Sequence, residues 1–354
     1  MFSLPIWNIY AEYIVLPSYT WVYTLLPYLQ PQLLHPQAKL EWKKCCDMPV
    51  HIGMSRPQVV LVTEKVYVGS GTVVRAENVE KYLVFQYTPS RDEWSRLPPH
   101  SLRYFAMAQF TGYLITVGGK IGLDIADNKL YRFKEESQNW EEFLKPMPTA
   151  RYFLSVATTQ SAIIASGGTT GEKGGVFVPC ATVEVYSSEA SQWYTADPLP
   201  VTCYRMTSTV LADTYYLLGG NGANNKAIPT VLYTSLTSLV QKALTPTPHQ
   251  SASCTSFWKF LPDTPFMVSA AASLSGSLLA VGGVCDSDTN RLTSAVHVFF
   301  PFTNSWVRVT DGDLPEPRQN CTAVQLSSNQ VLVVSGVLSR GKRSKGLLMA
   351  TLTV

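Results

Sequence analysis

The stretch Tyr113–Gly119, with the sequence YLITVGG, is an apolar run that ends in two glycines. An apolar run followed by Gly-Gly or Ser-Gly occurs six times in the 354-residue chain. The six pairs are Ser70-Gly71, Gly118-Gly119, Gly167-Gly168, Gly219-Gly220, Gly282-Gly283 and Ser335-Gly336. Successive closing glycines are 48, 49, 52, 63 and 53 residues apart, which indicates a repeated structural unit of about 50 residues.

A tryptophan recurs in phase with these glycine pairs. In four units it follows an aromatic residue by seven positions, as in Tyr87 and Trp94, Phe133 and Trp140, Tyr186 and Trp193, and Phe299 and Trp306. In the fourth unit Tyr233 takes the aromatic position, but the tryptophan comes late, as Trp258. We therefore interpret residues 241–257, which are rich in Ser, Thr, Pro and Gln, as an insertion that forms a solvated loop.

A Leu-Pro or Met-Pro step closes each unit and supplies a third marker. The steps begin at Met48, Leu97, Met147, Leu199, Leu261 and Leu314. With three markers in one phase over residues 40–354, the sequence resembles the kelch repeats. The resemblance implies an all-β fold, a six-bladed kelch-type β-propeller with four antiparallel strands in each blade. Ser70, Ser335 and the late Trp258 are departures from the repeat pattern.

The domain organisation follows from the phase of the repeats. Trp42 precedes the first closing glycine by 29 residues, yet it has no blade of its own upstream. We predict that this N-terminal strand completes the last blade, so that the ring has no exposed strand edge. The propeller is therefore expected over residues 39–354, behind an irregular apolar lead segment at residues 1–38.

The lead segment carries one formal charge, Glu12, and several prolines that interrupt any helix of membrane-spanning length. No Lys or Arg precedes Lys39, whereas a secretory signal begins with a basic region. We expect an irregular segment, with a membrane anchor, a signal and a fragment of a longer chain as the alternatives.

The composition narrows the class of protein. Charged residues make up 15% of the chain and hydrophobic residues 46%, which favours extensive buried sheet. The net charge of +3 gives no reason to expect nucleic-acid binding. The seven cysteines have no metal-ligand spacing, and we expect reduced, mostly buried thiols in a cytoplasmic monomer.

The sequence contains none of the common catalytic motifs, such as GxSxG, HExxH, a phosphate-binding loop or a dinucleotide fingerprint. Some propellers that this fold resembles hold copper with two His and two Tyr, but the five histidines here are scattered. We therefore expect no catalytic residues, no metal and no cofactor.

An arginine recurs 15 to 18 residues ahead of the closing glycine in five units: Arg56, Arg103, Arg151, Arg205 and Arg318. In kelch proteins that bind peptides, the loop at this place opens on the face around the central channel. We predict a basic, aromatic-lined cup formed by these arginines with Tyr104, Tyr152, Tyr204 and Asn320. The alternative is structural, with each arginine paired to backbone or carboxylates of a neighbouring blade.

These patterns favour a protein-interaction scaffold or adaptor that binds a partner's acidic loop or peptide on the arginine-bearing face. The alternative is a sugar-type enzyme or small-molecule binding protein that uses the channel mouth. That function would require a carboxylate or His beside the arginines. The basic run Arg340–Lys345 is expected to be a solvated turn rather than a nuclear signal.

Overall fold

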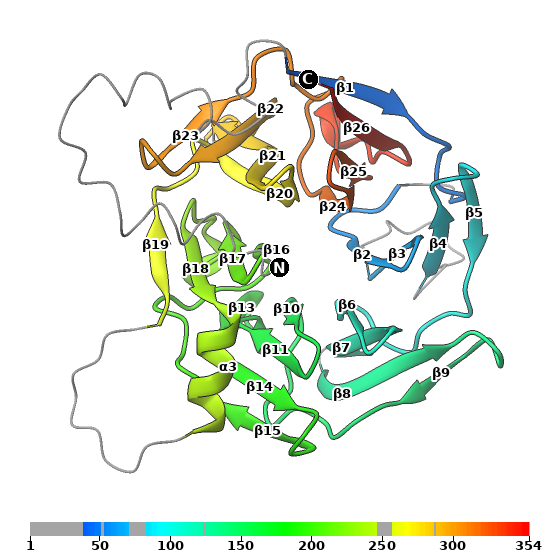
Figure 1. Cartoon of the computed structure of the whole chain (residues 1–354), viewed down its shortest axis with the longest axis vertical. Helices are drawn as coiled ribbons and strands as arrows, with labels where there is room; N and C mark the ends of the chain where they lie inside the picture. The colour runs from blue at the N-terminus through cyan, green and yellow to red at the C-terminus, as the bar shows by residue number, and fades with distance from the viewer. Residues whose placement is uncertain are drawn as a thin grey trace, which may run out of the picture.

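The computed structural model describes residues 38–50, 53–70, 83–122, 125–245, 257–286 and 288–353. These residues form a six-bladed β-propeller, in which six four-stranded antiparallel sheets surround a central channel (Figure 1). The predicted fold class is therefore confirmed.

The first three blades follow one another along the chain. Blade 1 consists of β2 (Gln58–Val62), β3 (Lys65–Gly69), β4 (Val84–Thr88) and β5 (Glu93–Arg96). Blade 2 consists of β6 (Ala106–Phe110), β7 (Tyr113–Ile121), β8 (Ile125–Lys134) and β9 (Asn139–Glu142). Blade 3 consists of β10 (Ser155–Thr158), β11 (Ala162–Ser166), β14 (Val183–Ser187) and β15 (Gln192–Thr195), with an added hairpin of β12 (Thr169–Lys173) and β13 (Val176–Pro179).

The remaining blades include both ends of the described chain. Blade 4 consists of β16 (Thr207–Leu211), β17 (Thr214–Leu218), β18 (Val231–Ser235) and β19 (Lys259–Leu261), with the short helix η2 (Ala223–Asn225) and the helix α3 (Leu236–Leu244). Blade 5 consists of β20 (Met267–Leu274), β21 (Ser277–Asp286), β22 (Arg291–Phe300) and β23 (Ser305–Arg308). Blade 6 consists of β24 (Thr322–Ser327), β25 (Gln330–Val334), β26 (Leu347–Thr353) and β1 (Lys39–Lys44), with the short helix η3 (Ser339–Gly341).

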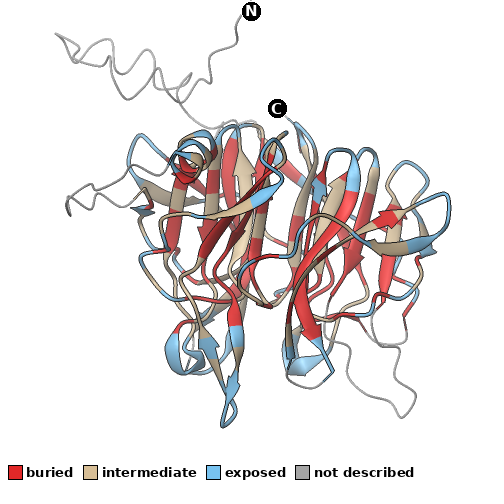
Figure 2. Ribbon diagram, turned by 90° about the horizontal axis from the view of Figure 1, so that it is seen from below, coloured by how far each residue is buried: buried red, intermediate tan, exposed pale blue. Residues whose placement is uncertain are grey.

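The sixth blade takes its outer strand from the N-terminal side of the chain. β1 pairs antiparallel with β26, from Lys39 opposite Thr353 to Lys44 opposite Leu348. The inner strands β2, β6, β10, β16, β20 and β24 contact one another in that order, and β24 also contacts β2. Figure 2 shows that the buried stretches lie in the middle of the blades, whereas the loops at both faces are exposed.

In the five pairs that the structure describes in full, the closing glycine is required by steric contact with the same blade. A Cβ added to Gly283 would lie 2.0 Å from the carbonyl oxygen of Met267, and one added to Gly336 would lie 2.9 Å from that of Gln319. The first position tolerates serine because a hydroxyl can be used there. Ser335, with φ of 59°, donates its hydroxyl to the carbonyl of Met54, 2.6 Å away.

The recurring tryptophans tie each blade to the one before it. Each indole N–H donates to a backbone carbonyl that follows the outer strand of the preceding blade, at 2.8–3.2 Å. The pairs are Trp94 to Cys46, Trp140 to Pro98, Trp193 to Lys145, Trp258 to Asp197, Trp306 to Pro262, and Trp42 to Gly312. The late Trp258 thus occupies the same place in blade 4 as its counterparts in the other blades.

Blade 4 contains a helix that the sequence analysis did not predict. Ser235 caps α3 by accepting a hydrogen bond from the backbone N–H of Ser238, and Leu236, Leu239 and Ala243 are buried. The helix packs on the outer strands of blade 3. It includes the first residues of the predicted insertion, while residues 246–256 and the lead segment 1–37 lie outside the described residues. No helix in the described part of the chain has the length and apolar character needed to cross a membrane.

Candidate ligand site in the central channel

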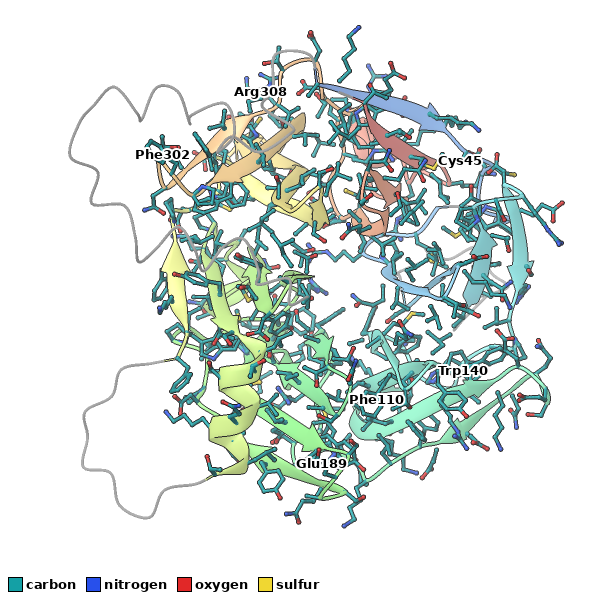
Figure 3. The ribbon with its side chains drawn as sticks, in the orientation of Figure 1. Cys45, Phe110, Trp140, Glu189, Phe302 and Arg308 are labelled. Atoms are coloured by element: carbon teal, nitrogen blue, oxygen red, sulfur yellow. The ribbon has the colours of Figure 1, made fainter. Side chains whose placement is uncertain are left out.

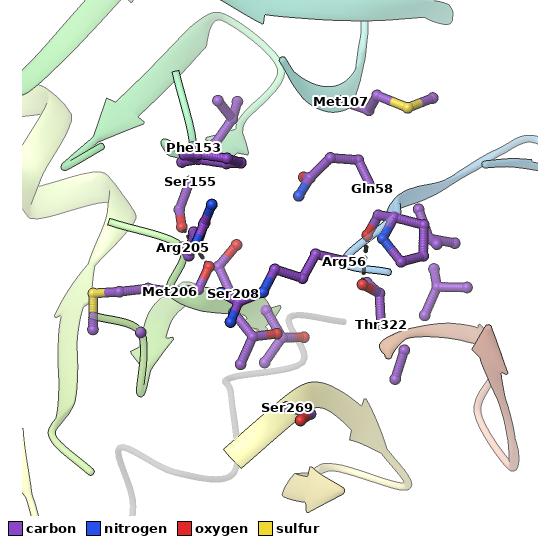
Figure 4. A pocket seen from close by; sticks show the side chains of 18 of the residues that line it. Arg56, Gln58, Met107, Phe153, Ser155, Arg205, Met206, Ser208, Ser269 and Thr322 are labelled. Carbon is purple, nitrogen blue, oxygen red and sulfur yellow. Dashed lines mark hydrogen bonds between the residues drawn. The ribbon is translucent and has the colours of Figure 1, made fainter. Parts of the chain in front are cut away.

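The central channel contains a cavity of about 470 Å³ that is lined by residues of all six blades. In five blades, one residue just ahead of the inner strand lies at the mouth of this cavity, and in blade 5 the mouth residue is the third residue of β20. These six mouth residues are Arg56, Tyr104, Phe153, Arg205, Ser269 and Asn320. Below them the wall combines apolar residues of the inner strands with polar ones such as Gln58, Ser155 and Ser208 (Figure 4).

Backbone geometry places the mouth residues at equivalent positions. All except Ser269 have a positive φ, between 55° and 59°. The N–H of Arg205 donates to the carbonyl of Phe153 at 2.9 Å, and the N–H of Phe153 donates to that of Tyr104 at 3.0 Å. Across the other half of the ring, the N–H of Arg56 donates to the carbonyl of Asn320 at 2.7 Å, and the N–H of Asn320 donates to Ser269 Oγ at 2.9 Å. Because these backbone donors are used within the ring, recognition at the mouth depends on side chains.

Arg56 and Arg205 bring two positive charges into the channel from blades 1 and 4. In Figure 4, Arg56 extends across the channel toward Arg205 and Ser208. Burial, and after it the nearby charge of Arg205, lower the pKa of Arg56 to about 10. Burial also lowers the pKa of Arg205. Neither arginine forms an ion pair with any residue that the structure describes.

Aromatic rings surround the guanidinium of Arg205. Its central carbon lies 3.9 Å from the ring centre of Phe153, 4.9 Å from that of Phe177 and 5.3 Å from that of Tyr204. Its Nε is buried without a hydrogen-bond partner among the described residues. The rings therefore hold the guanidinium in place while leaving hydrogen-bonding capacity for an anion.

Arg151 and Arg318 correct the prediction of a continuous arginine ring. Arg151 is 0% exposed and pairs with the buried carboxylate of Glu184 at 2.8 Å, while its other nitrogen donates to the carbonyls of Gly167 and Thr182. Arg318 is 2% exposed and donates to the carbonyl of Ser335 at 3.0 Å. Both precede the mouth residue of their blade by two positions, and their side chains are buried against their own blade instead of lining the cavity. Their partners lie in their own blades, blade 3 for Arg151 and blade 6 for Arg318, rather than in a neighbouring blade as the structural alternative expected.

Arg103, Tyr152 and Tyr204 each precede the mouth residue by one position. The Arg103 guanidinium donates to the carbonyl of Gly122, in the β7–β8 hairpin, and lies over the ring of Tyr104. Tyr152 and Tyr204 are buried, and both rings contact Phe177. These three residues support the mouth from behind, whereas Tyr104 and Asn320 line the cavity together with Arg56 and Arg205.

Sequence reasoning missed Phe153, Ser269 and Phe177. Phe153 had a usable signal, because it lies 15 residues ahead of its closing glycine, as do Arg56, Tyr104 and Arg205. The signal was the constant spacing rather than the residue type. Phe177 lies on the added β12–β13 hairpin, for which the repeat pattern gives no position.

Titratable groups that could perform chemistry do not gather in the channel. The described lining of the cavity contains no Asp, Glu or His. No group of three potential metal ligands from His, Cys, Asp and Glu occurs in the described ranges. Six cysteines are present there as thiols, of which Cys45, Cys203 and Cys321 are buried, half of the six rather than most. Burial raises the pKa of the Cys203 thiol to about 12, so it stays protonated at neutral pH.

We compared the chain with known protein families and curated proteins. No protein-family model matches the chain. Beta-scruin of Limulus polyphemus is 28% identical over 196 residues, which is 51% of this chain and 20% of the relative. Kelch-like protein 40 of Xenopus tropicalis is 24% identical, covering 59% of this chain and 30% of the relative. Kelch-like protein 38 of Mus musculus is 22% identical, covering 43% and 25%. The chain thus spans less than a third of the length of these relatives.

A solved structure, "Structure of YjhT", has the same fold. It superimposes with a TM-score of 0.67 at 14% sequence identity, covering 88% of this chain and 99% of that one. At this identity the likeness concerns the fold alone. Six phased repeats, six four-stranded blades and the kelch-like relatives together identify the chain as a kelch-repeat β-propeller.

Proposed function

We propose that the propeller is a protein-interaction module that binds an acidic group of its partner between Arg56 and Arg205. The observation that carries this proposal is the pair of half-buried guanidiniums at one mouth, with no ion pair to any described residue. Burial lowers the pKa of both guanidiniums, the charge of Arg205 also lowers that of Arg56, and a bound carboxylate would oppose these effects. The kelch-like relatives support a scaffold or adaptor role.

The enzyme alternative is less favoured. A sugar-type enzyme would use a carboxylate or His as general acid or base beside the arginines. The described lining supplies hydroxyls, amides and the two guanidiniums instead. These groups bind and orient an anion, which is the chemistry that an adaptor needs.

The proposal is tested by selecting a phage-displayed random 12-residue peptide library against the whole chain. We expect the selected peptides to share an Asp or Glu, and a representative synthetic peptide to lose at least tenfold in affinity when that residue becomes Asn or Gln. The double variant Arg56→Ala/Arg205→Ala should cause the same loss.

A matched control removes two positive charges elsewhere. Arg308 lies on the outer edge of blade 5 (Figure 3), and Arg91 is exposed at the rim of blade 1. Arg91→Ala/Arg308→Ala should leave the affinity within twofold. Selected peptides without acidic residues, or equal binding by the channel double variant, would overturn the proposal.

A further inference from the structure

The loops that surround the mouth of the cavity, around Arg56 and Arg205, differ between the blades in length and in exposed apolar residues. Two long hairpins belong to adjacent blades, β7–β8 in blade 2 and β12–β13 in blade 3, and β12 contacts β8. Seven large apolar residues are exposed in the described part of the chain. Four of them lie at the mouth end of these two hairpins, namely Ile121, Ile125, Val176 and Val178, whereas Tyr113 begins β7 at its other end. Exposed apolar residues are thus concentrated on one side of the mouth.

The two hairpins present these side chains in an ordered way. Ile121 and Ile125 are directly opposite each other in the β7–β8 register, and Ile125 is 67% exposed. Along β13, Val176 and Val178 alternate with Phe177, so they lie on the opposite side of the strand. Phe177 itself contacts Tyr204 and the Arg205 guanidinium. One strand therefore connects the charged site with exposed aliphatic groups.

On the opposite side of the ring, the loop at the mouth carries exposed positive charges. Blade 6 is opposite blade 3, and its loop between β25 and β26 carries the exposed Arg340 and Lys342. This loop adjoins the mouth through the bridge between Gln319 and Val337. An acidic partner therefore meets cations in the channel and on the blade 6 side, and the exposed aliphatic groups of the described residues lie at blades 2 and 3.

We infer that the β7–β8 and β12–β13 hairpins bind aliphatic side chains of the same partner segment whose acidic residue occupies the arginine pair. The partner is an extended peptide with an Asp or Glu and an aliphatic residue separated by about two to four positions, at about 3.3 Å per residue. The acid fixes the position of the peptide, and the aliphatic residue fixes its direction toward blades 2 and 3. This inference rests on the proposed function.

The test uses synthetic ten-residue peptides, capped at both ends, with one central Glu in a Ser/Gly background. A single Leu is placed at each other position in turn. We expect Leu at a position two to four residues from the Glu, on one side only, to raise the affinity at least tenfold over the peptide without Leu. The double variant Ile125→Asp/Val176→Asp should remove this gain and leave the affinity of the Leu-free Glu peptide within twofold.

Controls separate the two proposals. Phe302→Asp changes an exposed apolar residue on the outer edge of blade 5 (Figure 3) and should leave the gain intact. If Glu peptides bind and depend on Arg56 and Arg205, but Leu gives no gain or the gain survives Ile125→Asp/Val176→Asp, only this inference is overturned. If no Glu peptide binds, both proposals are overturned. A wild-type dimer by sedimentation that Ile125→Asp makes monomeric would assign the hairpins to a second copy and also overturn the inference.

Discussion

Arg151 and Arg318 lie two positions earlier than Arg56 and Arg205 in the equivalent loops of their blades. This shift determines whether the side chain is buried or lines the channel. The mouth position has a positive φ and directs its side chain into the channel. Two residues earlier, the side chain is buried away from the cavity, where Arg151 meets Glu184 of its own blade. In this fold the position within the loop, rather than the residue type, determines whether an arginine is structural or available to a ligand.

Among these arginines, we expect the largest loss of stability from a substitution in the buried ion pair of Arg151 and Glu184. Arg151→Met removes the ionic partner of a carboxylate that is 2% exposed, leaving Glu184 charged and buried with the Thr149 hydroxyl as its remaining side-chain donor. We expect the free energy of unfolding to fall by about 3–5 kcal/mol, measured by urea denaturation. In the double variant Arg151→Met/Glu184→Leu most of this loss should be recovered, because no buried charge remains. A single variant as stable as wild type would break the comparison.

Arg318→Met should have a smaller effect. The only ionic partner of Arg318 among the described residues is Glu316, at 3.9 Å and exposed to solvent, and burial lowers the pKa of Arg318. Removing this charge relieves a desolvation penalty but leaves the carbonyl of Ser335 without its donor. The expected loss is about 1–3 kcal/mol in the same denaturation experiment. A loss as large as that of Arg151→Met would show that the buried carboxylate is not what distinguishes the two sites.

Arg56→Met should change stability in the opposite direction. The pKa of Arg56 in the folded chain, about 10, is below its ordinary value of 12.5, so the folded state binds this proton less tightly than the unfolded state. The penalty is complete below pH 10 and is relieved as the pH rises above it. We expect the variant to be more stable than wild type by about 1 kcal/mol at neutral pH. The difference should shrink between pH 10 and 12, and a variant less stable than wild type would contradict this assignment.

Much of the fold could be predicted from the sequence, because steric and packing demands repeat in every blade. The closing glycine is fixed by a backbone carbonyl, and the tryptophan by a carbonyl of the preceding blade. Even the displaced Trp258 was traceable, since its place in blade 4 is the same. The helix α3 was missed because its stabilising contacts, such as that of Leu239, are made with a neighbouring blade. Such contacts do not affect the spacing of the repeat markers in the sequence.

The site was predicted less well for a related reason. Arginines at 15 to 18 residues from the closing glycine were treated as one set, although neighbouring residues of this loop point to different places. Arg56 and Arg205 share the spacing of 15 with Tyr104 and Phe153, while Arg151 does not. Phe177 and the exposed residues of the two hairpins lie outside the repeat, so only the structure brings them to the mouth.

The sixth blade also determines the order in which the molecule can fold. The pairing of β1 with β26 joins residues more than three hundred positions apart, and no other blade requires such a contact. Bringing such distant segments together carries a loop-closure entropy that local pairings do not have. This entropy cost favours assembly of the last blade after the other five. Refolding should therefore proceed through an arc of finished blades with one open edge, the species most exposed to misassembly.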